Sequence, residues 1–544
     1  MKKNSFIGGT IIATLGIIIT KIIGLLYVIP FYAIIGDQGG ALYGYAYTVY
    51  QLFLSLSTAG FPFAISKLTS EYLALEETKA AKDVYYISRK LILILSLVIF
   101  VILFVFAPQI GRIIIGERTS GNTYEDIAFV IRCVSFAVLV IPFLSASKGF
   151  LQGHRNMTTS AVSQVIEQVV RVAVILLGSY VAMKVFNMSL TQAVGIAVFG
   201  AFLGGLAAYI YLRIKLKKSK LLEEKNDEEV RIEKKEIIKK LFKYSIPYIL
   251  ISLVYNLYNV VDMVLISRTL SDILNYDNTI IDTVISIYTT WGMKINMIIL
   301  ALSTGLVTSL IPNIVNNYTK KDTKKLNLNI NKAVQYVLLI IVPITIFLSL
   351  LAKPVWTMFY GKSTLGPVIY QFFVYAALFG SFYTISVSVL QGLSKYRLVI
   401  KSVLIGLLTN TLLDVPLMIL FDKLGMNASY GAILAQLIGF SLAVIISISN
   451  LAHEGCISFK STLKKIPTYL YSWGIFIISI LVLKLFIPIN LSSRIIQIPI
   501  LILFGVVSFG IYFYISYLNG NLTSVCDIKK IKDKILKKIK KSLK

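Results

Sequence analysis

Six ionisable side chains lie deep inside long apolar segments of this sequence. They are the cations Lys21, Arg171 and Lys294 and the anions Glu167, Asp262 and Asp414. A lysine or arginine at the centre of a membrane helix costs roughly 2.5–3.5 kcal/mol on insertion scales. Charges kept at such depth usually face an interior cavity and mark the path of a substrate or an ion. These six residues therefore form the candidate site.

Lys21 and Lys294 have no acidic residue three or four positions away, the spacing at which helical side chains pair. Two unpaired ammonium groups suit an anion with more than one negative charge, because ammonium binds phosphate oxygens as a point charge. A diphosphate is the natural candidate, and the spacing leaves other anions open. We expect Lys21, Lys294 and Arg171 to bind the substrate.

The acidic residues have two interpretations that the spacing does not separate. Glu167 stands four residues before Arg171, so the two can form an ion pair with a purely structural role. Asp262 and Asp414 either hydrogen-bond to neighbouring helices or, together with Glu167, take part in gating or ion coupling.

Three tyrosines, Tyr43, Tyr47 and Tyr50, recur on one face of a predicted helix. Their rings could stack on a sugar. The commoner role of tyrosine in membrane helices is in the interface belt and in helix packing, and we favour it here.

The composition indicates a protein that crosses a membrane many times. Of 544 residues, 56% are hydrophobic and 15% are charged, and the mean hydropathy is +0.78. A soluble domain has about 45–50% apolar and about 25% charged residues. The three cysteines lie far apart and there are only two histidines, so we expect no disulfide framework, metal site or cofactor.

Apolar runs of about 20 residues predict an all-α fold with fourteen membrane spans. The spans cover residues 6–35, 41–66, 86–110, 125–147, 158–183, 189–212, 244–267, 282–311, 333–352, 366–390, 398–421, 428–450, 466–488 and 495–517. The first run exceeds the roughly 7–15 residues of a signal-peptide core, and we interpret it as a retained helix. If both termini are cytoplasmic, most Lys and Arg residues fall in inner loops. This distribution explains most of the net charge of +28 without nucleic acid.

The sequence also contains an internal repeat. "LSTAGFPFAISKLTSEY" near residue 56 matches "LSTGLVTSLIPNIVNNY" near residue 302, and "GFLQGHRNM" matches "SVLQGLSKY". Six spans per repeat give two lobes of like orientation, an arrangement found in transporters whose substrate site lies between the lobes. The predicted domains are an N lobe (1–215), a basic linker (216–240), a C lobe (241–452), helices 13 and 14 (453–518) and a basic tail (519–544).

The plan of six, six and two spans, together with "TKIIG" in the first helix and "KGFLQGHRNM…SQVIEQVVRV" across the fourth and fifth, resembles one superfamily. It is the multidrug/oligosaccharidyl-lipid/polysaccharide exporter superfamily, and the similarity is greatest to its MurJ-like lipid II flippases and their stage V sporulation protein B relatives. The resemblance implies that Lys21 and Lys294 replace cavity arginines of the family. Tyr27 stands where some members carry a second arginine of the first helix.

By this resemblance, the protein is a flippase that moves an undecaprenyl-diphosphate-linked cell-wall precursor, foremost lipid II, to the outer leaflet by alternating access. The implied partners are that lipid-linked anionic oligosaccharide, membrane lipids and a coupling ion or the membrane potential, with the protein a monomer. Two alternatives within the superfamily are a multidrug or cation antiporter and an exporter of another lipid-linked polysaccharide unit. A membrane glycosyltransferase is disfavoured, because the outer loops are short and carry no paired acids.

Overall fold

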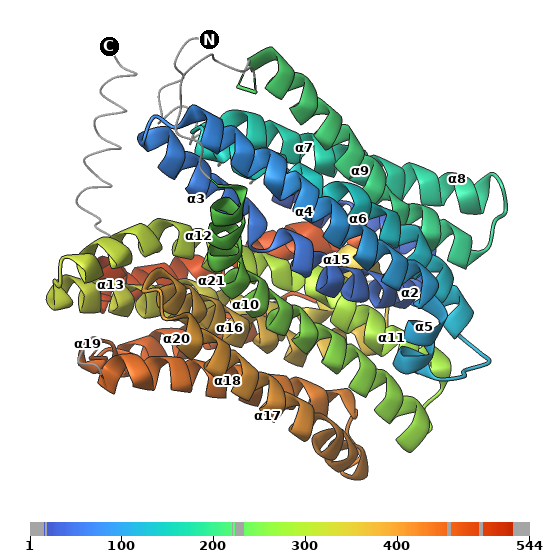
Figure 1. Ribbon diagram of the computed structural model, residues 1–544. Coiled ribbons are helices and arrows are strands. Elements are labelled where there is room, and N and C mark those ends of the chain that lie inside the picture. The colour runs from blue at the N-terminus through green and yellow to red at the C-terminus, as the bar shows by residue number, and fades with distance from the viewer. Residues whose placement is uncertain are drawn as a thin grey trace, which may run out of the picture. The chain divides into compact units, whose positions relative to one another are not determined.

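The computed structural model describes residues 16, 19–219, 221–222, 233–453, 458–488 and 493–525. Every regular element in this part of the chain is helical (Figure 1). The long elements begin after a helical stretch at residues 19–26. In chain order they are α2 (Val28–Thr58), α3 (Phe61–Ala74), α4 (Thr78–Val105), α5 (Ala107–Ile115), α6 (Tyr124–Gly153), α7 (Met157–Ala173), η1 (Val174–Gly178), α8 (Ser179–Lys184), α9 (Leu190–Ser219), α10 (Lys234–Arg268), η2 (Thr269–Ile273), α11 (Asn278–Thr289), α12 (Trp291–Thr319), α13 (Thr323–Tyr336), η3 (Val337–Ile341), α14 (Val342–Leu350), α15 (Ala352–Tyr360), α16 (Leu365–Gly392), α17 (Tyr396–Lys423), α18 (Ser429–His453), α19 (Lys460–Leu463), α20 (Ile466–Phe486), α21 (Arg494–Leu518) and α22 (Asn521–Val525).

The prediction of an all-α protein with many membrane spans is confirmed. Within the described residues, thirteen helical segments are long and apolar enough to cross a membrane. The first of them, Val28–Ala74, is interrupted at Gly36, whose φ of 63° breaks the helix between the predicted spans 6–35 and 41–66. Residues 6–15, 17 and 18 of the predicted first span lie outside the described residues, so fourteen spans remain a prediction, as do the placement of the termini and the fold of the basic tail.

The chain forms two compact units. The first comprises Met1–Lys294 with Asp414–Ala428, and the second comprises Ile295–Leu413 with Ser429–Lys544. In the first unit, α6 packs against α9, α4, α3 and α2, while α2 also packs against α10 and α11. All six candidate site residues belong to this first unit.

Left-handed residues recur at matching points of the two predicted lobes. Positive φ angles occur in the pairs Glu76 and Lys321, Gly116 and Gly361, and Arg155 and Ser394. The members of these pairs are 245, 245 and 239 residues apart, close to the spacing of the sequence matches. Since residues other than glycine rarely adopt this conformation, its repetition supports the proposal that 1–215 and 241–452 are related lobes.

Helices α20 and α21 are anchored in the second unit by side chains that donate to backbone carbonyls. The π-helical turn η3 disrupts the regular hydrogen-bond ladder of its helix. Two of its carbonyls accept side-chain hydrogen bonds, Leu338 from Trp473 Nε1 at 3.1 Å and Leu339 from the Tyr512 hydroxyl at 2.9 Å. Arg494 Nη2 donates to the Tyr360 carbonyl at the end of α15 at 3.0 Å. The C-terminal helix pair is therefore positioned by hydrogen bonds as well as by apolar packing.

Replacing Tyr512 by Phe should lower the stability of the protein by about 1–3 kcal/mol, because a buried carbonyl loses its donor. Thermal unfolding of the detergent-solubilised protein measures the effect. Tyr514→Phe is the matched control, since Tyr514 lies two residues away and is 65% exposed. Equal melting temperatures for the two variants would contradict this anchoring role.

Candidate functional site

Three cations of the first unit gather in one region. Lys21 lies on the helical stretch before α2, Arg171 near the end of α7 and Lys294 in the first turn of α12. The charge of Lys294 acts on Lys21, and that of Arg171 acts on Lys294. As whole residues, Lys21 is exposed and Lys294 is half-buried. The structure thus brings together three residues that are far apart in the sequence.

An aromatic ring supports Lys294. Its Nζ lies 5.2 Å from the centroid of the Tyr27 ring, a cation–π geometry, and Tyr27 is only 6% exposed. Tyr27 in turn packs against Phe31. The family resemblance gives Tyr27 no role beyond standing where some members carry an arginine. In the structure, the Tyr27 ring contacts the ammonium group of Lys294.

The tyrosines of α2 line the same region. Tyr43 stacks on Tyr47 with ring centroids 5.4 Å apart, and Tyr47 lies 5.5 Å from Tyr50. Tyr43 and Tyr50 are buried, and all three act electrostatically on Arg171. They pack inside the protein beside the cations, and only Tyr47 keeps partial exposure.

Glu167 binds two cations at once. Its carboxylate accepts from Arg171 Nη2 at 2.8 Å and from Lys148 Nζ at 2.9 Å. The expected pair of Glu167 and Arg171 is therefore present, and Lys148 is a third member that sequence reasoning missed. Lys148 stands one residue beyond the predicted span 125–147, at a position where a lysine is expected to belong to a loop. The triad carries one net positive charge next to the tyrosines.

Asp262 and Asp414 form a separate acidic pair. Asp262 lies on α10 and is 6% exposed, and Asp414 lies on α17 and is fully buried beside it. Two neighbouring carboxylates in a dry interior cannot both stay charged without a counterion. This pair is suited to hold a proton or a small cation.

These long apolar helices and their interior charged clusters define a multispan membrane transporter. The model of the polysaccharide biosynthesis protein family matches residues 6–317. Lipid II flippase MurJ of Bacillus subtilis (strain 168) is 31% identical over 535 residues, which cover 96% of this chain and 97% of that protein. The chain therefore belongs to the MurJ-like branch of the multidrug/oligosaccharidyl-lipid/polysaccharide exporter superfamily.

Solved structures share the fold. A structure described as lipid II flippase MurJ in an inward closed conformation matches with a TM-score of 0.65 and 17% identity over 94% of this chain and 99% of its own. An inward-facing multidrug resistance transporter of the MATE family matches with a TM-score of 0.62 and 17% identity, covering 84% of this chain and 99% of its own. At these identities the likeness establishes the fold alone.

Replacing Glu167 by Gln should destabilise the protein by about 1–3 kcal/mol, because Lys148 and Arg171 lose their shared charged acceptor. Adding Lys148→Met should recover part of this loss, which thermal unfolding of both variants measures. Lys325→Met is the control, since Lys325 pairs with Asp322 while 71% exposed and should have little effect. Strictly additive effects of the two substitutions would argue against a coupled triad.

Proposed function

We propose that this protein is a flippase for an undecaprenyl-diphosphate-linked cell-wall precursor, foremost lipid II, and carries it from the inner to the outer leaflet by alternating access. The observation that carries the proposal is the gathering of Lys21, Arg171 and Lys294 in one region with a single carboxylate among them. The extensive similarity to a lipid II flippase supports the same substrate class.

The physical task is to move a charged headgroup across about 30 Å of hydrocarbon. Exposed Lys21 and half-buried Lys294 can replace the water around a diphosphate. Tyr27 holds the Lys294 ammonium in place without neutralising it, whereas an acidic partner would compete with the substrate. Arg171 keeps its charge next to Glu167 and contributes to the positive field.

Energy coupling is assigned to the acidic pair. In this proposal Asp262 and Asp414 bind a proton or a small cation whose gradient, or the membrane potential, drives the return of the empty carrier. Glu167 serves the triad and is not a coupling group, because both its partners are cations. The protein acts as a monomer in the plasma membrane with both termini in the cytoplasm.

A multidrug or cation antiporter is the second candidate, and the acidic pair is the observation that favours it. Against it, the clustered lysines repel cationic drugs. Resistance of expressing cells to such drugs, with no effect on lipid-linked precursors, would favour the antiporter over the flippase. An exporter of another lipid-linked polysaccharide unit would use the same cations and differ only in the headgroup.

Lys21→Ala and Lys294→Ala should each reduce complementation of a flippase-depleted strain, and the double variant should abolish it while the protein is still present in the membrane. Arginine at either position should restore growth, because it keeps the positive charge. Lys325→Ala is the control, since Lys325 is largely exposed. Normal growth of the double alanine variant would refute the cationic site.

Tyr27→Leu should reduce flippase activity several-fold, and Tyr27→Phe should reduce it less, since phenylalanine keeps the ring that faces Lys294 and loses only the hydroxyl that hydrogen-bonds to it. Loss of a cation–π contact costs about 0.5–2 kcal/mol, which corresponds to a factor of roughly 2–30. The measurement is the rate of precursor exposure on the outer leaflet at equal protein levels. Equal rates for the phenylalanine and leucine variants would show that the ring is not needed.

A further inference from the structure

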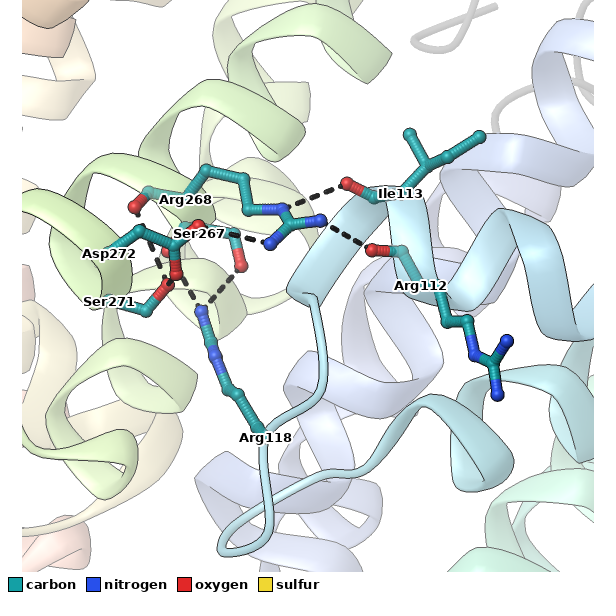
Figure 2. Close-up of polar contacts among 7 residues, drawn as sticks. All are labelled: Arg112, Ile113, Arg118, Ser267, Arg268, Ser271 and Asp272. Atoms are coloured by element: carbon teal, nitrogen blue, oxygen red, sulfur yellow. Dashed lines mark hydrogen bonds and ion pairs between the residues drawn. The ribbon is translucent and has the colours of Figure 1, made fainter.

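The loop between α5 and α6 crosses over the end of α10. We call residues 116–123 the strap. Figure 2 shows Arg118 of the strap and Arg268 of α10 reaching past each other between the two segments. The predicted topology, with both termini in the cytoplasm, places the strap on the outer side of the membrane.

Arg268 fixes the start of the strap. Its Nε donates to the Ile113 carbonyl at 3.1 Å and its Nη2 to the Arg112 carbonyl at 2.6 Å, while Nη1 pairs with Asp272 at 3.0 Å. A cation at the C-terminal end of α5 also suits the helix dipole. Gly116 follows with a φ of 75°, and a Cβ there would lie 2.4 Å from Arg268 Nη1. Only glycine lets the strap begin this close to the guanidinium.

The rest of the strap is tied to α10 and α11. Arg118 Nη2 donates to the carbonyl and the hydroxyl of Ser267, both at 2.8 Å. The backbone N–H of Asn122 donates to Asp282 Oδ2 at 3.1 Å, and Asn278 Nδ2 donates to the Ser120 hydroxyl at 2.6 Å. Most of these contacts are charge-assisted or amide hydrogen bonds, which can break without exposing apolar surface.

The strap also holds the seam between α2 and α11. Asn122 Nδ2 donates to the carbonyl of Gln38 at 3.0 Å. Two residues further along α2, the Gly40 carbonyl accepts from the Thr290 hydroxyl at 2.8 Å. Thr290 is only 2% exposed. Opening this seam to the outside therefore requires the strap to let go of α10 and α11.

Unused hydrogen-bonding capacity points to a second arrangement of the strap. Among the described residues, Asp282 Oδ1 is buried without a hydrogen-bond partner, and the Arg118 guanidinium, which lies beside Tyr45 as well as Ser267, does not use all its donors, although Arg118 and Asp282 act on each other electrostatically. Buried unsatisfied polar groups are costly. A shift of Arg118 from Ser267 to Asp282 would satisfy both residues and free α10, leaving the strap joined to α11 alone as a first step of release.

We propose that the strap is an outer latch, which closes the seam between α2 and α11 by gripping α10 and α11 through Arg118 and Arg268, and which releases when the protein opens outward. The latch rests on the proposed function in that it regulates outer access to the same transporter. Transport substrate is not needed for it to hold or to release, so it can be tested separately from flipping.

The test uses the full-length protein with Thr290→Cys as reporter and with Cys133, Cys456 and Cys526 replaced by serine. Intact cells are treated with a membrane-impermeant maleimide. The double variant Arg118→Ala/Arg268→Ala should label about tenfold faster than the parent, which corresponds to about 1.4 kcal/mol in favour of the open form. Arg112→Ala is the control, because the Arg112 side chain packs on and hydrogen-bonds to Tyr124 of α6, and the carbonyl that accepts from Arg268 is kept.

Unchanged labelling of the double variant, at normal protein level and melting temperature, would overturn the latch. If that variant is unstable, the double variant Ser120→Cys/Asn278→Cys provides a complementary test, in which the latch is held closed. Oxidation should tie the strap to α11, block transport in complemented cells and be reversed by reductant, and continued transport after full cross-linking would also overturn the latch. Faster labelling of the double variant, together with failure of the unaltered protein to complement a flippase-depleted strain, would support the latch and refute the flippase.

Discussion

The structure depends on one constraint: a charge placed within a membrane-spanning bundle must be solvated, paired or supported. Each deep cation of this protein meets the constraint differently. Lys21 is exposed, Lys294 lies over the ring of Tyr27, and Arg171 shares Glu167 with Lys148. Only the third arrangement neutralises charge, so the region as a whole stays positive. That residual charge is what an anionic headgroup requires.

Both local backbone geometry and contacts between distant segments position the side chains of this protein. Gly36 interrupts α2, and the π-helical turn η3 presents carbonyls to Trp473 and Tyr512. Asp262 and Asp414 act on each other, and in the proposed function this acidic pair binds the coupling ion while the cations bind the substrate. Both groups of residues belong to the first compact unit.

Features that follow from a local sequence pattern can be predicted from this sequence, whereas contacts between segments far apart in the chain cannot. Apolar runs predict several helices to within a few residues, as 398–421 does for α17, and charge within those runs predicts Glu167 beside Arg171. No pattern predicts Lys148 as a partner, since α6 continues six residues past the predicted span 125–147 and Lys148 meets Glu167 only across α6 and α7. The contact of Tyr27 with Lys294 and that of Arg118 with Ser267 cannot be predicted from the sequence either, because the partners are more than a hundred residues apart.

The central claim is that a positive cluster recognises diphosphate. Native mass spectrometry of the purified protein with undecaprenyl diphosphate and undecaprenyl monophosphate, at equal concentrations, tests it most directly. The account predicts preferential retention of the diphosphate lipid, and loss of that preference when Lys21 and Lys294 are both alanine. Equal retention of the two lipids by the unaltered protein, or a preference that survives removal of both lysines, would contradict it.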